Sequence, residues 1–273
     1  MSRIAERFAD LKKNQRTALV PYVTAGDPQP GTTVPVLHAM VEAGADMLEI
    51  GVPFSDPMAD GPVIQAACER ALVHHVTLHQ VLDMVRKFRQ KDSATPVILM
   101  GYLNPIEVWG YREFAKAAGE AGVDGVLTVD MPPEEADELT GFLQANGVDA
   151  IFLLAPTSTG ERMQKVAGQA SGFIYYVSFK GVTGANRLDT DAVATRINEV
   201  RQYTDLPLGV GFGIRDAETA AQVAKIADAV VVGSVLVGKI AELADSPESI
   251  PAALASTIAE LRVAIDQASV ALT

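Results

Sequence analysis

The chain has 273 residues, of which 48% are hydrophobic and only 6% aromatic. It is longer than a typical single domain but within the range of one large α/β domain, and its low aromatic content favours helices packed on strands over a β-sandwich. With 22 basic and 34 acidic residues the formal net charge is −12. A charge of that sign repels nucleic-acid phosphates and anionic membrane surfaces, which excludes both as expected partners.

Cys68 is the only cysteine, so no intrachain disulfide can form, and a reducing compartment is the natural setting. Its neighbours predict a buried, unreactive thiol on a helix face. Residues 1–8 are charged and amphipathic, unlike a signal peptide, and no apolar stretch is long enough to span a bilayer. These features predict a cytoplasmic protein.

Short aliphatic runs alternate with longer, Ala-rich segments of helical period along the whole chain. An amphipathic helix over Ile4–Lys13 comes first, and a long helix over Ile250–Ala271 comes last. The eight predicted strands are Ala18–Tyr22, Met47–Gly51, Val97–Met100, Gly125–Val129, Ala150–Leu154, Phe173–Val177, Leu208–Gly211 and Ala229–Val232. The predicted helices between them are Val34–Glu42, Ile64–Val73, Leu78–Gln90, Tyr111–Ala121, Pro133–Asn146, Glu161–Ala170, Asp191–Tyr203 and Ala217–Ala227.

Eight strand–helix units favour closure into a (β/α)8 TIM barrel over an open sheet, because closure leaves no exposed strand edge. Most of the strands are continuous apolar runs, as expected for strands buried on both faces. Three helix-to-strand junctions share one form, Gly44-Ala45-Asp46, Gly122-Val123-Asp124 and Gly147-Val148-Asp149, in which the glycine is expected to cap the helix. We predict a single catalytic domain over residues 1–273, with the N-terminal helix closing the bottom of the barrel and a short helix after strand eight.

The active site of such a barrel lies at the carboxyl ends of its strands. On the second strand, period-two alternation places Leu48 and Ile50 on one face and Glu49 on the other. If the aliphatic pair faces the helices, Glu49 points into the barrel, where desolvation raises its pKa toward a value useful for proton transfer. The alternative is a structural carboxylate satisfied by backbone N–H groups, and the residue pattern leaves both readings open.

The next loop, over residues 51–62, carries two acids among three prolines and two glycines, a stiff excursion that can bring a second carboxylate over the barrel mouth. Asp56 and Asp60 are both candidates. Asp60 precedes Gly61-Pro62, so it could instead cap the following helix. Spacing alone does not choose between the two acids.

Glycine-bearing loops follow strands six, seven and eight, at residues 181–184, 209–214 and 231–234. Glycines let the backbone approach an anion closely, and the free N–H groups of a helix start bind it. The pattern therefore predicts a phosphate site at the position where many barrels have one, rather than glycines that serve strand packing alone.

Other chemistries are not indicated. The four histidines, His38, His74, His75 and His79, have no cysteine or acidic partners at zinc spacing and are interpreted as surface residues, so no metal is expected. There is no Walker or dinucleotide-binding glycine motif and no serine–histidine–aspartate set. Lys180 lies in a polar loop rather than at a strand end, which argues against a Schiff base.

The segments at residues 24–28, 51–62, 181–185 and 211–214 closely resemble the tryptophan synthase α chain, in order along nearly the whole chain. The resemblance implies a carbon–carbon lyase of tryptophan biosynthesis that cleaves indole-3-glycerol phosphate to indole and glyceraldehyde 3-phosphate. It implies no cofactor in this chain and a partner, the pyridoxal-phosphate-bearing β chain, in an α2β2 complex that receives the indole. The docking residues implied are Asp56, Asn104-Pro105 and Pro132.

By the same resemblance the two catalytic carboxylates fall on Glu49, the general acid and base, and Asp60, which would bind the indole N–H. Thr183 would tie the strand-six lid (Ser178–Leu188) to Asp60 on closure, and Tyr175 would lie near the reacting centre. The implied phosphate ligands are Gly184, Gly213, Gly233 and Ser234. The implied indole pocket comprises Tyr22, Met100, Tyr102, Leu127, Val129, Leu153 and Phe212.

The chain departs from the family pattern in the lid stretch Ser178-Phe179-Lys180, where an arginine occurs in the family, and at Tyr22 and Met100, where Phe and Leu can occur. Three rival hypotheses remain: a stand-alone lyase that releases indole without a partner, a different phosphate-binding barrel such as a sugar-phosphate epimerase, and a non-catalytic subunit that activates its partner.

Overall fold

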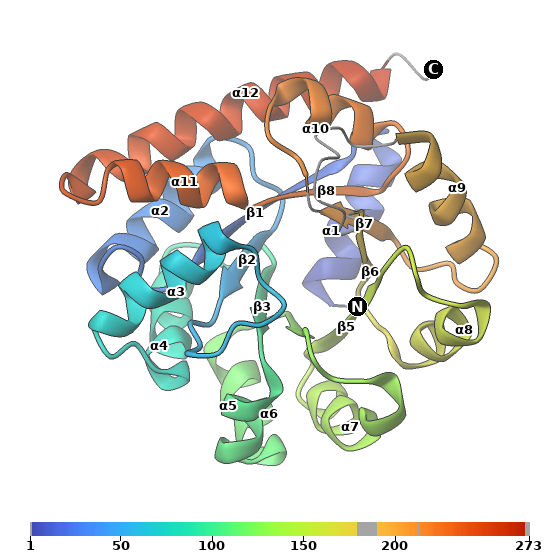
Figure 1. Ribbon diagram of the computed structural model, residues 1–273, viewed down its shortest axis with the longest axis horizontal. Helices are drawn as coiled ribbons and strands as arrows, with labels where there is room; N and C mark the ends of the chain where they lie inside the picture. The colour runs from blue at the N-terminus through green and yellow to red at the C-terminus, as the bar shows by residue number, and fades with distance from the viewer. Residues whose placement is uncertain (1, 179–189, 212, 271–273) are drawn as a thin grey trace.

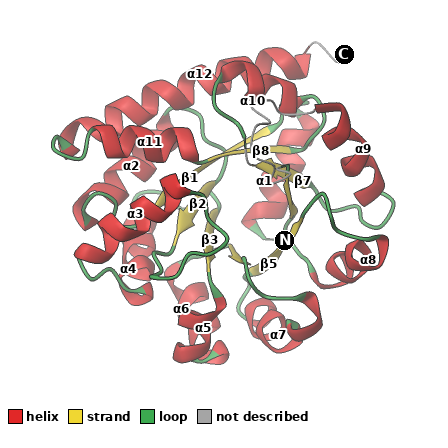
Figure 2. Cartoon of the chain, in the orientation of Figure 1, coloured by secondary structure: helices red, strands yellow, loops and turns green. Residues whose placement is uncertain are grey.

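The structure is a computed structural model that describes residues 2–178, 190–211 and 213–270. Eight parallel strands are hydrogen-bonded in chain order, and the eighth pairs with the first to close a barrel. Figure 1 shows the helices ringing the strands, and Figure 2 shows the strands gathered at the centre. The predicted (β/α)8 TIM barrel is confirmed. In the described ranges no helix combines the length and apolar character that crossing a membrane requires.

The strands match the sequence prediction within two residues at each end. They are β1 (Ala18–Thr24), β2 (Leu48–Gly51), β3 (Val97–Gly101), β4 (Gly125–Thr128), β5 (Asp149–Leu154), β6 (Ile174–Val177), β7 (Leu208–Gly211) and β8 (Ala229–Val232). The α-helices are α1 (Arg3–Lys13), α2 (Pro30–Glu42), α3 (Pro62–Val73), α4 (Leu78–Arg89), α5 (Leu103–Trp109), α6 (Tyr111–Ala121), α7 (Asp137–Ala145), α8 (Gly160–Gln169), α9 (Thr190–Val200), α10 (Ala217–Ala224), α11 (Ser234–Glu242) and α12 (Ile250–Val270). Two 3-10 turns are η1 (Pro133–Glu135) and η2 (Pro247–Ser249).

Four predicted helices differ from the structure by three residues or more at one end, and one helix was not predicted. The helices α9 and α10 end at Val200 and Ala224, three residues before the predicted Tyr203 and Ala227. The helix α2 begins at Pro30, four residues early, because proline is tolerated at a first helical position where its missing N–H would have no partner. The segment predicted as one helix from Pro133 starts as the 3-10 turn η1, and α7 begins only at Asp137. The helix α5 was not predicted, since its seven residues bury only Ile106 completely and so carry no helical period.

The inside of the barrel is filled by aliphatic side chains and closed from below by α1. Ile4, Phe8 and Leu11 of α1 belong to the same buried cluster as Ile98 of β3 and Phe173, the residue before β6. The rings of Phe8 and Phe173 lie 5.8 Å apart. In Figure 1, α1 lies within the ring of helices. The predicted role of the first helix as a plug for the barrel is therefore confirmed.

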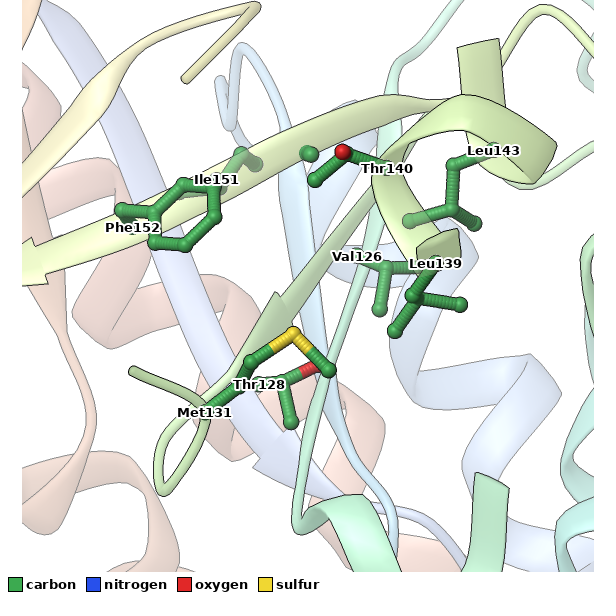
Figure 3. A pocket seen from close by; sticks show the side chains of 9 residues that line it. Val126, Thr128, Met131, Leu139, Thr140, Leu143, Ile151 and Phe152 are labelled. Atoms are coloured by element: carbon green, nitrogen blue, oxygen red, sulfur yellow. The ribbon is translucent and has the colours of Figure 1, made fainter. Parts of the chain in front are cut away.

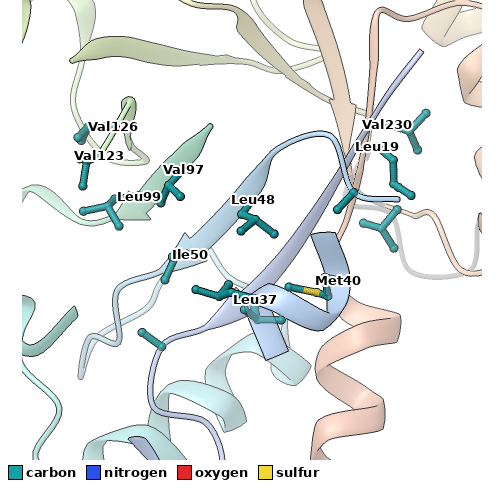
Figure 4. Close-up of a cluster of buried hydrophobic side chains, with 14 of the residues drawn as sticks. Leu19, Leu37, Met40, Leu48, Ile50, Val97, Leu99, Val123, Val126 and Val230 are labelled. Atoms are coloured by element: carbon teal, nitrogen blue, oxygen red, sulfur yellow. The ribbon is translucent and has the colours of Figure 1, made fainter. Parts of the chain in front are cut away.

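A second cluster packs the outer faces of the strands against the helices. Leu37 and Met40 of α2 lie beside Leu48 and Ile50 of β2 in this cluster (Figure 4). Because successive side chains of a strand point to opposite faces, Glu49 points into the barrel. Leu48 and Ile50 do face the helices, which was the condition for the prediction that Glu49 points inward.

The Gly-x-Asp junctions lock the amino ends of the strands. Gly44, Gly122 and Gly147 all have positive φ angles, as helix-ending glycines require. The carboxylate of Asp46 accepts the Leu19 N–H at 2.9 Å, and that of Asp124 accepts the Val97 N–H at 2.8 Å. These aspartates lie at the end of the barrel opposite the strand carboxyl ends, where they stabilise the strands by accepting backbone N–H groups.

Candidate active site

Glu49 is a buried carboxylate of β2. The strand register places it beside Tyr22 of β1 on one side and Ile98 of β3 on the other. Its side chain is buried, and its Oε1 atom has no hydrogen-bond partner among the described residues. A structural carboxylate would be satisfied by backbone N–H groups, so this arrangement favours a group that reacts with a bound molecule.

Burial, and to a lesser extent the nearby charge of Asp60, together raise the pKa of Glu49 from its usual 4.5 to about 8. A carboxyl with a pKa in that range can both donate and accept a proton near neutral pH. The Tyr22 and Tyr175 hydroxyls are also buried, and the pKa of each is raised well above its usual value, chiefly by desolvation. Both tyrosines therefore stay protonated and neutral beside Glu49.

Asp60 occupies the loop between β2 and α3, and its carboxyl group turns toward the barrel mouth. Its Oδ2 accepts a hydrogen bond from the Tyr102 hydroxyl at 2.9 Å. Partial burial raises the pKa of Asp60, and the Tyr102 hydrogen bond opposes that shift. Asp60 does not cap α3, since the N-cap is Gly61 and no side chain caps it. Asp56 is exposed and accepts from the Ser55 hydroxyl at 2.6 Å, so Asp60 is the loop acid that acts on Glu49.

Tyr102 has a role in addition to the pocket wall predicted for it. Besides donating to Asp60, its hydroxyl accepts the Ala59 N–H at 3.0 Å. Its ring stacks on Phe54, with ring centres 5.1 Å apart. Tyr102, at the start of α5, thus contacts the loop at residues 51–62 (the acidic loop) both near its beginning, at Phe54, and near its end, at Asp60. Sequence reasoning missed these contacts, because 42 positions separate the hydroxyl donor from Asp60.

Apolar side chains on the inner strand faces form the walls of the mouth. Met100, Val129 and Leu153 are half-buried and pack on the inner cluster, whereas Leu127 is completely buried beneath them. The hydroxyl ends of two tyrosines lie against glycines of neighbouring strands: Tyr22 covers Gly51, and Tyr175 covers Gly211. A Cβ at either glycine would collide with the tyrosine, so the missing side chain is what leaves room for each hydroxyl.

Part of the predicted phosphate site lies within the described residues. Gly213 has a φ angle of +80°, Gly233 is the N-cap of α11, and Ser234 is the first residue of that nine-residue helix. Among the described residues no side chain caps this helix start, so its first N–H groups can bind an anion. Thr183, Gly184 and Phe212, predicted for the lid, the phosphate and the pocket, lie outside the described residues.

Two cavities lie outside the barrel mouth and are too small for a substrate. One lies between β4, β5 and α7, bounded by side chains that include Val126, Met131 and Leu143 (Figure 3). The other lies under α5, against Gly101 and Phe114. Each holds about 10 Å³, the space of a single water molecule, and both are lined mainly by apolar groups.

No three histidine, cysteine, aspartate or glutamate side chains in the described ranges are grouped closely enough to hold a metal ion. His74, His75 and His79 are exposed, as predicted. The prediction was wrong for His38, which is half-buried on α2 with the centre of its ring 4.7 Å from that of Phe88 and the two rings tilted relative to each other. Cys68 is buried, as predicted, on the face of α3 that packs near Tyr22.

A sequence profile for the tryptophan synthase alpha chain matches residues 8–266. The chain belongs to the tryptophan synthase alpha chain family. It is 62% identical over 266 residues to the tryptophan synthase alpha chain of Thioalkalivibrio sulfidiphilus, covering 97% of this chain and 100% of that one. The alpha chain of Nitrosococcus oceani is also 62% identical over 266 residues, covering 97% and 98% of the two chains.

Solved structures of this family have the same fold. Tryptophan synthase subunit alpha from Legionella pneumophila str. Paris superposes with a TM-score of 0.91 at 47% identity, covering 98% of this chain and 99% of that one. The resemblance predicted from the loops at residues 24–28, 51–62, 181–185 and 211–214 is thereby confirmed.

The residues predicted to face an alpha chain's partner lie after the carboxyl ends of β2, β3 and β4. Asp56 is exposed in the β2–α3 loop, and Pro132 precedes η1. Asn104 and Pro105 lie in the first turn of α5. A proline is tolerated there because the first helical N–H groups have no partner within the helix.

Proposed function

We propose that this chain cleaves indole-3-glycerol phosphate to indole and glyceraldehyde 3-phosphate, a carbon–carbon lyase reaction of tryptophan biosynthesis, and that residues 1–273 act as one catalytic domain. The observation that carries the proposal is Glu49, a buried carboxyl with a pKa of about 8 at the barrel mouth, facing the charge of Asp60. Membership of the tryptophan synthase alpha chain family supports the substrate.

In the proposed mechanism Glu49 starts protonated and donates its proton to the ring carbon that bears the glycerol chain. The ring nitrogen becomes positively charged, and the Asp60 carboxylate stabilises it by accepting its N–H. Glu49, now ionised, takes the proton of the hydroxyl on the carbon attached to the ring. The carbon–carbon bond then breaks, which releases the aldehyde and restores neutral indole and protonated Glu49. A pKa near 8 serves both transfers, because neither form of Glu49 is strongly preferred.

The phosphate of the substrate would bind at Gly213, Gly233 and Ser234, with Gly184 of the lid. Backbone N–H groups at the start of α11 supply the attraction, which explains how a chain of net charge −12 could hold an anion. The indole would lie between the inner strand faces and be held by a set of side chains that comprises Tyr22, Met100, Tyr102, Leu127, Val129, Leu153, Tyr175 and Phe212. Thr183 would hydrogen-bond Asp60 when the lid closes and so exclude water.

We also propose that the chain works in the cytoplasm with a tryptophan synthase β chain in an α2β2 complex, to which it passes indole. Pyridoxal phosphate would belong to that partner, and this chain would use no cofactor of its own. The exposed Met58 and Val108 support a protein contact on this side of the barrel, because they lie near Asp56 and Asn104 and are 82% and 81% exposed.

The test is indole release from indole-3-glycerol phosphate by the purified chain, with and without a β chain, and with Glu49→Gln as the control variant. We expect release that rises when the β chain is added and disappears in the variant. Release that the β chain leaves unchanged would indicate a stand-alone lyase. Absence of release by the wild-type chain under both conditions would refute the reaction.

A further inference from the structure

Gln65, the fourth residue of α3, binds the back of the turn that carries Asp60. Its Nε2 donates to the Asp60 carbonyl oxygen at 2.8 Å and to the Pro57 carbonyl oxygen at 3.3 Å. The Asp60 N–H donates to the same Pro57 oxygen at 3.1 Å. One carboxamide therefore links the beginning and the end of the turn to the first helical turn of α3.

Asp60 is consequently held at two points from two different helices. Tyr102, at the start of α5, binds its carboxyl group, and Gln65 binds its main-chain carbonyl. A hydrogen bond to the carboxyl fixes only the side-chain torsions, whereas the position of the Cα atom depends on the turn. We infer that Gln65 is a positioning residue for the proposed reaction: by fixing the turn, it keeps the Asp60 carboxylate at the place where the indole N–H arrives.

The chemistry of the turn explains why a glutamine is needed. The two carbonyl oxygens that Gln65 binds are acceptors, and a primary amide supplies two N–H donors without a charge that would compete for the Asp60 carboxylate. Gly61, the helix N-cap, offers no side chain to perform this task. A displacement of about 1 Å in a reacting or binding group can cost on the order of a hundredfold in rate, so greater mobility of this turn should lower the rate of cleavage.

The position of Asp60 also affects Glu49. Asp60 is the nearby charge that raises the Glu49 pKa beyond the effect of burial, and the neighbouring Tyr22 and Tyr175 are neutral. If the turn loosens and the Asp60 carboxylate moves away, the Glu49 pKa should fall. This consequence distinguishes positioning from a contribution to helix stability alone.

The inference rests on the proposed function and is tested with Gln65→Met, which keeps the length of the side chain and removes both donors. The matched control is Gln169→Met on α8, which follows β5 on the other side of the barrel (Figure 1). Gln169 is also half-buried and also donates through Nε2, to Asp137. In steady-state cleavage with the β chain present, we expect kcat to fall about ten- to a hundredfold in Gln65→Met, with KM near the wild-type value. The control should keep wild-type kcat.

The second measurement needs no activity. In the ligand-free chain with ¹³C-labelled glutamate carboxyl groups, the Glu49 signal is assigned by its loss in Glu49→Gln and titrated by NMR. We expect a lower Glu49 pKa in Gln65→Met than in the wild type and in Gln169→Met. An unchanged kcat and an unchanged titration would overturn the inference, as would a fall in melting temperature with neither effect. A wild-type chain that releases no indole would refute the proposed function, while the titration would still decide the role of Gln65.

Discussion

Replacing Glu49 by glutamine should stabilise the fold by an amount that grows with pH. In the folded chain Glu49 has a pKa of about 8, against a usual value of 4.5 for the unfolded chain. Between these values the unfolded state gives up the proton and the folded state keeps it, so the unfolded state binds fewer protons and stability falls as pH rises. Below about 4.5 the penalty is absent, and above about 8 it is complete.

The size of this loss of stability follows from the pKa difference, because each pH unit between the two pKa values costs about 1.4 kcal/mol. From pH 4.5 to 7 the difference of about 2.5 units costs about 3 kcal/mol, and the full difference of about 3.5 units sets a ceiling of about 5 kcal/mol. A glutamine side chain at this position does not ionise, so Glu49→Gln removes the whole pH-dependent part. Any change in packing adds an offset that is the same at every pH.

The assay is urea unfolding at 25 °C of the wild type and Glu49→Gln at pH 5, 6, 7 and 8, with the free energy of unfolding extrapolated to water. The control, Glu260→Gln, makes the same chemical change at an exposed position on α12. We expect the advantage of Glu49→Gln over the wild type to increase by about 3 kcal/mol or more between pH 5 and 8. A difference that stays constant across this range would show that Glu49 is ionised in the folded chain, and the proposed proton donation at neutral pH would fail with it.

Three further substitutions probe the surroundings of the site. Asp60→Asn should reduce indole release at least about a hundredfold and lower the pKa of Glu49, and a Glu49 titration by ¹³C NMR identical to that of the wild type would contradict the charge coupling. Arg70→Met should cost about 3–5 kcal/mol in urea unfolding at pH 7, because it strips the fully buried Asp27 carboxylate of a two-point ion pair at 2.7 and 2.8 Å; wild-type stability would refute that. Gly51→Ala should reduce kcat/KM about tenfold or more, because the new methyl group pushes the neighbouring tyrosine of β1 into the mouth, and unchanged kinetics would mean that the ring has room to move aside.

The acidic loop illustrates where reasoning from the residues stopped. Spacing left Asp56 and Asp60 equal, and only the resemblance to a known family chose Asp60. The structure separates the two by contact: Asp60 binds Tyr102, while Asp56 is exposed. The hydroxyl and the carboxyl that meet there come from loops 42 positions apart, and no local pattern reports a meeting over that distance.

Local patterns were sufficient for the barrel itself. Strands buried on both faces read as continuous apolar runs, glycine commonly follows the end of a helix where the chain reverses, and eight repeats of this unit can close on themselves. Alternation along β2 was enough to predict that Glu49 points inward, since a strand has only two faces. The helix α5 escaped prediction, because a helix of seven residues that buries a single side chain completely leaves too little period to recognise.

The tertiary structure alone decided how strongly each group is perturbed and what holds it in place. The raised pKa of Glu49 depends on the closed barrel that removes water from it and on the distance to Asp60. The two hydrogen bonds of Gln65 depend on the conformation of the turn that leads from Pro57 to Asp60 directly before α3. The burial of His38 likewise depends on the packing of α2 against α4. Residue types and their order determine which elements form, but desolvation and hydrogen bonding depend on what surrounds a group in space, and the closure of the barrel sets those surroundings.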